Sequence, residues 1–202
     1  MFTGIVETIG TLVSIEPRGG DRTLTIEAGA GFLRGVRVGD SIACSGACLT
    51  ATRVRGKRFT ADVSIQTLTA TTARSWHAGT PLNLEKALTP TTPLGGHLVT
   101  GHIDGVGRLS ARKPEARSVR LDFSVPKPLA RYIASKGSIC VDGVSLTVNT
   151  VGTAGVGAAG FGVNIIPHTL QHTTLGRLVP GDPVNLEVDL LARYLERLVN
   201  KK

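Results

Sequence analysis

The sequence predicts an all-β protein in which two similar small barrels follow one another and a helix ends the chain. Three observations lead to this prediction: the chain repeats itself, each repeat consists of short β-rich runs, and the last residues have helical periodicity. Because a repeat dictates the architecture of a chain, the duplication is the most informative of the three.

The two halves of the chain match each other at two constant offsets. Residues 3–7 (TGIVE) match residues 100–104 (TGHID), and the two glycines give an offset of 97 (101 − 4). Residues 81–85 (PLNLE) match residues 183–187 (PVNLE), an offset of 102 (183 − 81). Further pairs at these offsets are Ser41 with Ser138, Gly46 with Gly143, Leu49 with Leu146, Thr50 with Thr147, Phe59 with Phe161, Thr67 with Thr169 and Leu68 with Leu170.

The change of offset means that the second half gains five residues (102 − 97) inside the small-residue stretch 151–160. This stretch reads as a lengthened hairpin loop. A phosphate-binding loop is the alternative, but no Lys-Ser/Thr pair and no helical pattern follow it. The offsets predict an N-terminal barrel at residues 1–93, a C-terminal barrel at 94–189 and a terminal helix at 190–202.

Each half contains short runs of β-forming residues separated by glycine, proline or charged turns. In the first half the runs cover residues 4–12, 23–28, 41–47, 58–64 and 82–84. A closed barrel removes the exposed edges that such short strands would otherwise present. One helical turn is expected before each Ser-Ile strand, at residues 31–36 and 128–135.

The terminal segment has apolar residues on one side and charged residues on the other. The apolar stripe consists of Leu190, Leu191, Tyr194, Leu195, Leu198 and Val199. This pattern is typical of an amphipathic helix. The stripe could pack on the chain's own barrel; we prefer the interpretation that it binds further copies of the chain.

Composition excludes several classes of protein. The net charge is +8, but the basic residues are scattered and aromatic residues make up only 4% of the chain, which argues against nucleic-acid binding. A basic surface can instead attract anionic metabolites. We find no apolar run of about 20 residues and no signal peptide, so we expect a cytoplasmic protein without membrane segments. The three cysteines lack metal or disulfide spacing, so we expect free thiols.

Several motifs, in order along the chain, resemble the riboflavin synthase family. They are MFTGIVE at the start, CLT in the first half, GGHLVTGHID in the middle, VDGVSLTV in the second half, and IPHTL and VNLEVD near the end. The resemblance implies two six-stranded antiparallel barrels, a homotrimer held partly by C-terminal helices, and an active site between one subunit's N-terminal barrel and a neighbour's C-terminal barrel. It also allows association with lumazine synthase.

The resemblance implies a dismutation that needs no cofactor and no metal. Two molecules of 6,7-dimethyl-8-ribityllumazine react, a four-carbon unit passes from one to the other, and riboflavin and a pyrimidine are formed. A duplicated fold suits a reaction between identical molecules because it offers two nearly equivalent pockets. Holding both reactants in register can contribute about 7–11 kcal/mol to the lowering of the barrier.

The resemblance also implies the residues of the two pockets. The N-terminal pocket would be made by Phe2, Gly4, Ile5, Val6, Cys48, Leu49, Thr50, Asp62, Val63, Ser64, Ile65, Gln66 and Thr67. The C-terminal pocket would be made by Gly101, His102, Ile103, Lys136, Ser145, Leu146, Thr147, Ile165, Ile166, Pro167, His168, Thr169 and Leu170. The chemistry would be carried by Cys48, His102, Lys136, Ser145, Thr147 and Asp189.

Two of these candidates occupy the same position in the two repeats, since Cys48 corresponds to Ser145 at the offset of 97. We expect this thiol and hydroxyl to polarise or transiently capture the lumazine, with Cys48 nucleophilic only if its pKa is lowered. Cys48 could instead be a small buried hydrophobic residue. Ser145 lacks the second glycine of a hydrolase elbow, so an esterase is disfavoured.

Other candidates also have structural alternatives. His102 replaces Ile5 of the first repeat, so we interpret it as a general acid or base, with a purely structural histidine as the alternative. His97 would point away from His102 on one strand, which argues against a metal site. Asp189 could simply cap the terminal helix, and Lys136, which matches Gly39, could be a turn residue.

A non-enzymatic lumazine- or flavin-binding protein, of the kind used as an optical antenna, is the main rival function. Such proteins keep one working site, whereas this chain retains the polar groups of both. Ser45 and the pair Ile65-Gln66 depart from the family pattern, where asparagine and an acidic residue are common. These departures affect how the first pocket would hold a ribityl chain.

Overall fold

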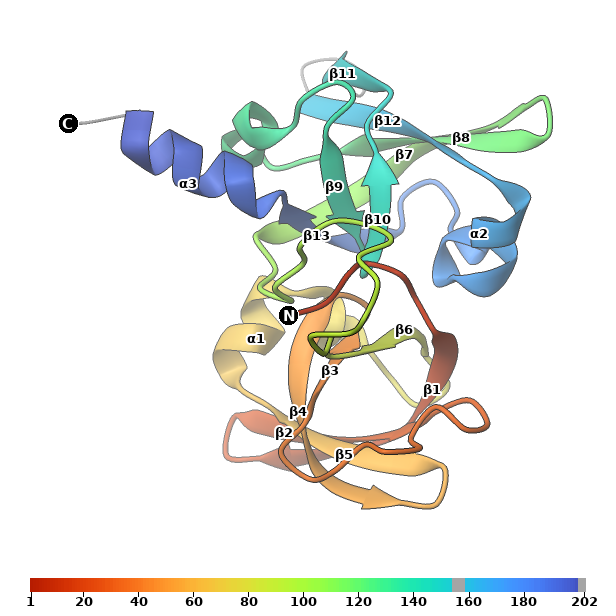
Figure 1. Ribbon diagram of the computed structural model, residues 1–202, viewed down its shortest axis with the longest axis vertical. Helices are drawn as coiled ribbons and strands as arrows, with labels where there is room; N and C mark the ends of the chain where they lie inside the picture. The colour runs from red at the N-terminus through yellow and green to blue at the C-terminus, as the bar shows by residue number, and fades with distance from the viewer. Residues whose placement is uncertain (154–158, 200–202) are drawn as a thin grey trace.

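The computed structural model describes residues 1–153 and 159–199, and its first half is a closed antiparallel barrel (Figure 1). The strand order around the barrel is β1-β2-β5-β4-β3-β6. The strands are β1 (Thr8–Arg18), β2 (Asp21–Glu27), β3 (Ser41–Cys44), β4 (Ala47–Arg55), β5 (Arg58–Val63) and β6 (Pro81–Lys86). The prediction of an all-β barrel is confirmed for this half.

The second half is a seven-stranded sheet that curls in the same way. Its order is β10-β9-β13-β7-β8-β12-β11. The strands are β7 (Gly105–Glu115), β8 (Ser118–Ser124), β9 (Ser138–Val141), β10 (Val144–Thr147), β11 (Thr150–Thr153), β12 (Ala159–Ile165) and β13 (Pro183–Val188). A curled sheet of seven strands therefore replaces the six-stranded closed barrel that we expected here.

The extra strand arises because one strand of the repeat is interrupted. β10 and β11 together correspond to β4, and they are separated at Val148 and Asn149. The first half has a β-bulge at the matching place, between Ala51 and Arg53. Both halves make the same backbone hydrogen bond at this point: the Lys136 N–H donates to the Val148 carbonyl at 2.8 Å, as the Gly39 N–H does to the Ala51 carbonyl. A bulge in one repeat has become a break in the other.

The helices differ from the sequence-based expectation. No helix forms at 31–36, where residues 30–35 make consecutive turns, whereas the segment expected at 128–135 is the 3-10 helix η2 (Lys127–Tyr132). Four short helices were not predicted: α1 (Ile65–Ala70), η1 (Thr72–Ser75), α2 (Pro167–His172) and η3 (Thr174–Arg177). Part of the expected hairpin loop at 151–160 lies outside the described residues, but the strands on either side of it are paired.

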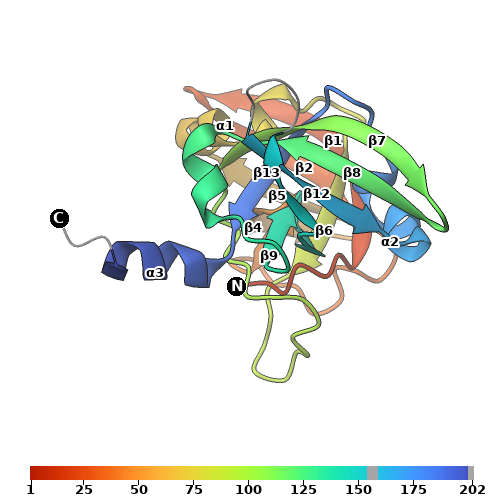
Figure 2. The same cartoon turned by 90° about the horizontal axis from the view of Figure 1, so that it is seen from above.

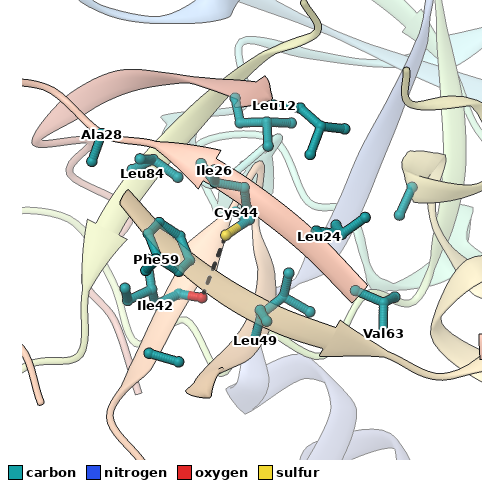
Figure 3. Close-up of a cluster of buried hydrophobic side chains, with 14 of the residues drawn as sticks. Leu12, Leu24, Ile26, Ala28, Ile42, Cys44, Leu49, Phe59, Val63 and Leu84 are labelled. Carbon is teal, nitrogen blue, oxygen red and sulfur yellow. Dashed lines mark hydrogen bonds between the residues drawn. The ribbon is translucent and has the colours of Figure 1, made fainter. Parts of the chain in front are cut away.

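Alternating side chains fill each half with its own apolar core. In the first half Leu12, Leu24, Ile26, Phe59 and Leu84 point inward (Figure 3). Burying each of these side chains contributes about 1.5–3 kcal/mol. The second half repeats this arrangement around Leu109, Leu121, Phe123, Phe161 and Leu186, with two of the phenyl rings stacked.

The strands β6 and β13 are buried on both faces because they lie where the two halves meet. Leu82 and Leu84 point into the first barrel, so Asn83 between them faces the second half. Asn83 accepts a hydrogen bond from the Thr174 N–H at 2.8 Å. Its repeat partner Asn185 accepts one from the Thr72 N–H at 2.7 Å. The repeated NLE motif therefore joins the halves reciprocally.

The N-terminal segment crosses between the halves. Its first strand begins at Thr8 rather than at residue 4, and the N-terminus lies between the two halves (Figure 1). Phe2 is fully buried and pairs with Val99 in an isolated bridge. With Ala43 and Cys140 these residues form a third small core between the halves.

The final element, α3 (Leu190–Val199), extends away from the barrels (Figures 1 and 2). It confirms the predicted helix as far as the structure describes it. The residues of its apolar stripe from Leu191 onward are exposed, so the stripe does not pack on the chain's own barrel. Within the described residues no helix is long and apolar enough to cross a membrane.

Candidate functional site

The two repeats exchange their glycine-containing segments. The Ser145 N–H of the second half donates to the Gly4 carbonyl at 2.7 Å, and the Cys48 N–H of the first half donates to the Gly101 carbonyl at 2.9 Å. Val6 likewise packs on the core of the second half. Gly4, Ile5 and Val6 therefore belong beside Ser145, and Gly101, His102 and Ile103 beside Cys48. This corrects the expected grouping.

Glycine is required at both crossing points. Gly4 has φ +75°, and a Cβ on it would lie 2.6 Å from the Ser145 Cβ. Gly101 has φ +80°, and a Cβ there would lie 2.5 Å from the Cys48 Cβ. A side chain at either glycine would push the two segments apart, because the glycine backbone is in direct contact with Ser145 or Cys48 of the other segment.

A buried glutamate holds each exchanged segment in place. Glu85 accepts hydrogen bonds from the Thr3 N–H and hydroxyl at 2.6 and 2.7 Å, and from the Gly4 N–H at 3.0 Å. Burial raises the pKa of Glu85, and these three bonds act in the opposite direction. In the second repeat Glu187 binds Thr100 and Gly101 in the same way. In both repeats, therefore, the glutamate of the NLE motif accepts hydrogen bonds from the threonine and the glycine of the TG motif.

Ser145 has a histidine partner that was not predicted. The His97 Nδ1 lies 2.7 Å from the Ser145 Oγ, and the imidazole is 9% exposed. We expected His97 on the opposite face of a strand from His102, but residues 95–104 form no strand, so that argument does not apply. The comparison of the repeats did not reveal the pair, because at the offset of 97 only Ser145 has a partner in the aligned segments, which is Cys48.

The surroundings of His97 favour the neutral form of its ring. Burial lowers the pKa of His97, and the charge of Asp189 opposes that effect. A neutral imidazole can accept the Ser145 hydroxyl proton at Nδ1. Its Nε2 is buried and has no hydrogen-bond partner among the described residues. The arrangement can orient the hydroxyl of Ser145 and receive a proton from it.

Asp189 fills the structural role that we considered for it. Its Oδ1 accepts a hydrogen bond from the Leu191 N–H at 2.9 Å, and its carbonyl accepts one from Ala192 at 3.0 Å. It therefore caps α3. The charge of Asp189 also raises the pKa of His97, against the larger effect of burial.

The Cys48 side carries a different set of polar groups. Cys48 is half-buried, and no disulfide involves it. The Ser64 hydroxyl accepts a hydrogen bond from the Thr67 N–H at 3.2 Å and so caps α1. Asp62 accepts one from the Thr23 hydroxyl at 2.6 Å. In the second half Ile166 replaces Ser64 as the capping residue and makes no such bond.

The predicted site residues differ widely in exposure. The side chains of Phe2, Leu49, Val63 and Ile165 are buried in the cores. Half-buried residues are Val6, Cys48, Thr67, Ile103, Ser145, Leu146, Thr169, Leu170 and Asp189. Exposed residues are Ile5, Thr50, Asp62, Ser64, Ile65, Gln66, His102, Lys136, Thr147, Ile166, Pro167 and His168. The site thus presents an open surface of mixed polar and apolar side chains.

Lys136 has an unusual backbone. Its φ is +67°, in the left-handed region that Gly39 occupies with φ +96° in the first repeat. A lysine in this conformation is strained, which is a recurrent property of functional positions. Across the described part of the chain no three histidine, cysteine, aspartate or glutamate residues gather as a metal-binding set.

The closed barrel and the curled sheet are two copies of one β fold, and each half contributes a glycine-containing segment to the matched site of the other. The sequence profile of the lumazine binding domain matches this chain twice, at residues 3–87 and 100–189. The chain therefore belongs to the lumazine-binding domain family.

Several relatives match nearly the whole chain. It is 41% identical to riboflavin synthase of Photobacterium phosphoreum over 98% of this chain and 89% of that protein. It is 42% identical to riboflavin synthase of Brucella abortus (strain 2308), over 98% of each chain. Riboflavin synthase of Bacillus subtilis (strain 168) is 36% identical over 100% of this chain and 91% of its own length.

The fold is also similar to solved structures of LumP. LumP complexed with 6,7-dimethyl-8-(1'-D-ribityl) lumazine superposes with a TM-score of 0.82 at 26% identity, over 93% of this chain and 99% of LumP. LumP complexed with riboflavin superposes with a TM-score of 0.84 at 27% identity, over the same shares of the two chains.

Proposed function

We propose that this chain is a riboflavin synthase, a transferase that converts two molecules of 6,7-dimethyl-8-ribityllumazine into riboflavin and 5-amino-6-ribitylamino-pyrimidinedione. The observation that carries the proposal is the pair of matched sites, Cys48 against Gly101 and Ser145 against Gly4. The near full-length similarity to riboflavin synthases supports the reaction. Because donor and acceptor are the same molecule, two related sites are what the chemistry requires.

Each site binds one lumazine, and the exchanged segments form one wall of it. The hydroxyls of Thr50, Ser64 and Thr67 face the ribityl chain in one site, and those of Thr147 and Thr169 do so in the other. Placing two lumazines in register removes the entropy cost of a bimolecular encounter, which is worth about 7–11 kcal/mol. The acidity of the lumazine ring methyl supplies much of the remaining reactivity.

The two sites act differently because their polar groups differ. Ser145, held by His97 at 2.7 Å, polarises or transiently captures one lumazine, and Cys48 occupies the equivalent place for the other. The exposed His102 acts as a general acid or base on the Cys48 side. Lys136 and Asp189 stabilise charge that develops as the four-carbon unit moves.

The sites are open in a single chain, which supports completion by a second copy. Ile5, Ile65 and Ile166 border them and are 48%, 60% and 57% exposed. Exposed apolar side chains of this kind are typical of association surfaces. We infer a homotrimer that places the site of one copy's first half opposite the second half of another copy, with α3 as a main contact.

The remaining elements of the proposal follow from this assignment. Residues 1–93 and 94–189 are the two lumazine-binding units, and residues from 190 onward serve association. The chain acts in the cytoplasm, needs neither metal nor organic cofactor, and can associate with a lumazine synthase that supplies its substrate.

The second candidate function is non-enzymatic binding of lumazine or flavin, which the similarity to LumP favours. The two functions are separated by incubating purified chain with 6,7-dimethyl-8-ribityllumazine in the presence of a chelator. Riboflavin formation, followed by its absorbance, supports the enzyme. Tight binding of the lumazine without any riboflavin supports the binding protein and rejects the enzyme.

A further inference from the structure

The segment that carries His102 is held at both ends. At one end Gly101 donates to Glu187 at 2.9 Å and accepts from Cys48. At the other end Asp104 donates its N–H to the Leu186 carbonyl at 2.8 Å and accepts the Val188 N–H at 2.8 Å. His102 lies exposed between the two anchors, so their positions decide where its ring points.

The second anchor depends on the terminal helix. The Arg193 Nη2 contacts both carboxylate oxygens of Asp104, at 2.9 and 2.8 Å. The side chains are 32% and 19% exposed, so water screens the pair only in part. The Arg193 Nε is buried without a hydrogen-bond partner among the described residues. Arg193 therefore gives up solvation to hold this one carboxylate.

The first repeat makes the same anchor without a helix. Glu7 corresponds to Asp104 and accepts the Lys86 N–H at 2.8 Å, as Asp104 accepts that of Val188. The positive partner of the Glu7 carboxylate is the ammonium group of the same residue, Lys86 at the end of β6, at 3.2 Å. The second repeat has Val188 at this position and takes its cation from α3 instead. The segment that carries His102 is thus the one that α3 contacts through Arg193.

A further contact fixes the orientation of the helix. The Tyr132 hydroxyl donates to Glu196, and Arg131 forms an ion pair with the same carboxylate at 2.8 Å. Arg193 and Glu196 lie three residues apart and so share one face of α3. This polar face binds the chain's own second half, and the apolar stripe is left on the outer side.

We propose that Arg193 is a positioning residue that couples the placement of α3 to the placement of His102 through Asp104. The inference rests on the proposed function, because it assigns His102 a part in the reaction. Through this contact, α3 and the segment of residues 101–104 move together. A change in how α3 is held then reaches His102 without any contact between the helix and the substrate.

The test compares Arg193→Gln with Arg197→Gln, a change of an exposed arginine on the same helix. For Arg193→Gln we expect kcat to fall by about 10- to 100-fold, with a much smaller change in KM, because misplacement of a reacting group acts on the chemical step. Arg193→Lys should recover most of the lost rate, since one ammonium can take the place of the single Nη2. The Asp104→Asn and Arg193→Gln effects should not add in the double variant.

A spectroscopic measurement separates this inference from the proposed function. The ring resonances of His102, assigned by comparison with His102→Gln, should shift in Arg193→Gln and stay unchanged in Arg197→Gln. This holds whether or not the wild-type chain forms riboflavin. If Arg193→Gln does not fold, Asp104→Asn gives the same readouts. Equal kcat values and equal His102 resonances in the Arg193 and Arg197 variants would overturn the coupling.

Discussion

Cys48 and Ser145 occupy equivalent places in the two repeats, yet within the described structure only Ser145 has a hydrogen bond to a histidine. A hydroxyl is a weaker nucleophile than a thiol at neutral pH and gains more from a neighbouring base. The difference in partners therefore matches the difference in chemistry. Burial raises the pKa of Cys44 and Cys140, so those two thiols are inert core residues.

Removing the Ser145 hydroxyl tests whether this hydroxyl takes part in the reaction. We expect Ser145→Ala to lower kcat by about 100-fold, because both the polarising group and the proton path to His97 are lost. The control is Ser110→Ala, which changes an exposed hydroxyl in the same half. Steady-state kinetics with the lumazine give the comparison, and equal rates for the two variants would rule out a catalytic part for Ser145.

Lys136 tests whether backbone strain is retained for function. Lys136→Gly should stabilise the fold by about 0.5–1 kcal/mol, because glycine adopts positive φ without steric cost, and should lower kcat. Ala116→Gly is the matched control: Ala116 has φ +51° in an exposed hairpin, so we expect similar stabilisation with unchanged kcat. Chemical unfolding and kinetics on both variants decide. Unchanged kcat in Lys136→Gly would leave that lysine a turn residue.

Among the elements, α3 has two faces with different tasks. Its polar face binds Asp104 and Tyr132 of the same chain, and its apolar stripe is exposed. We expect Leu195→Glu to lower the molar mass of the assembly while the far-ultraviolet circular dichroism stays unchanged, because Leu195 is 59% exposed and leaves both cores intact. Sedimentation equilibrium measures the mass. Val179→Glu, an exposed apolar position elsewhere, serves as control, and an unaltered mass in Leu195→Glu would reject association through the stripe.

How far the sequence predicted these elements depends on the kind of signal each one leaves. Duplication predicted two barrels because matched motifs survive at constant offsets. Strand β4 was missed because polar residues such as Arg53 and Arg55 break its alternation, and α1 because six residues with two threonines carry a weak helical pattern. The exchange of Gly4 and Gly101 could not be predicted, since an offset assigns each segment to its own repeat and says nothing of which half it contacts.

At the scale of the whole molecule, the buried contact between the two halves contains an acidic residue, Asp142, whose equivalent in the first repeat is not acidic. Asp142 corresponds to Ser45 and is 7% exposed. Its Oδ1 accepts the Asn185 N–H at 2.8 Å. Burial raises the pKa of Asp142 to about 7, against the lowering effect of this bond. The ionised carboxylate is therefore a cost to the folded chain.

This raised pKa predicts how stability depends on pH. The folded chain holds the proton of Asp142 more tightly than the unfolded chain does, so this group makes the free energy of unfolding fall as the pH rises from about 4 to about 7. Asp142→Asn keeps an acceptor for Asn185 and removes the charge. We expect it to raise the free energy of unfolding by about 2–4 kcal/mol at about pH 8 and to have little effect near pH 4. Urea unfolding at both pH values measures this, with the exposed Asp40→Asn as control. A gain that is the same at both pH values would contradict the assignment.

The central claim is that each repeat builds one lumazine site and that the exchanged glycine segments complete both. Titration calorimetry with a non-reactive lumazine analogue tests it most directly. We expect two analogue molecules to bind per wild-type chain, and one per chain when Cys48→Trp or Ser145→Trp fills either site. A wild-type chain that binds a single analogue, or variants that both abolish all binding, would contradict the claim.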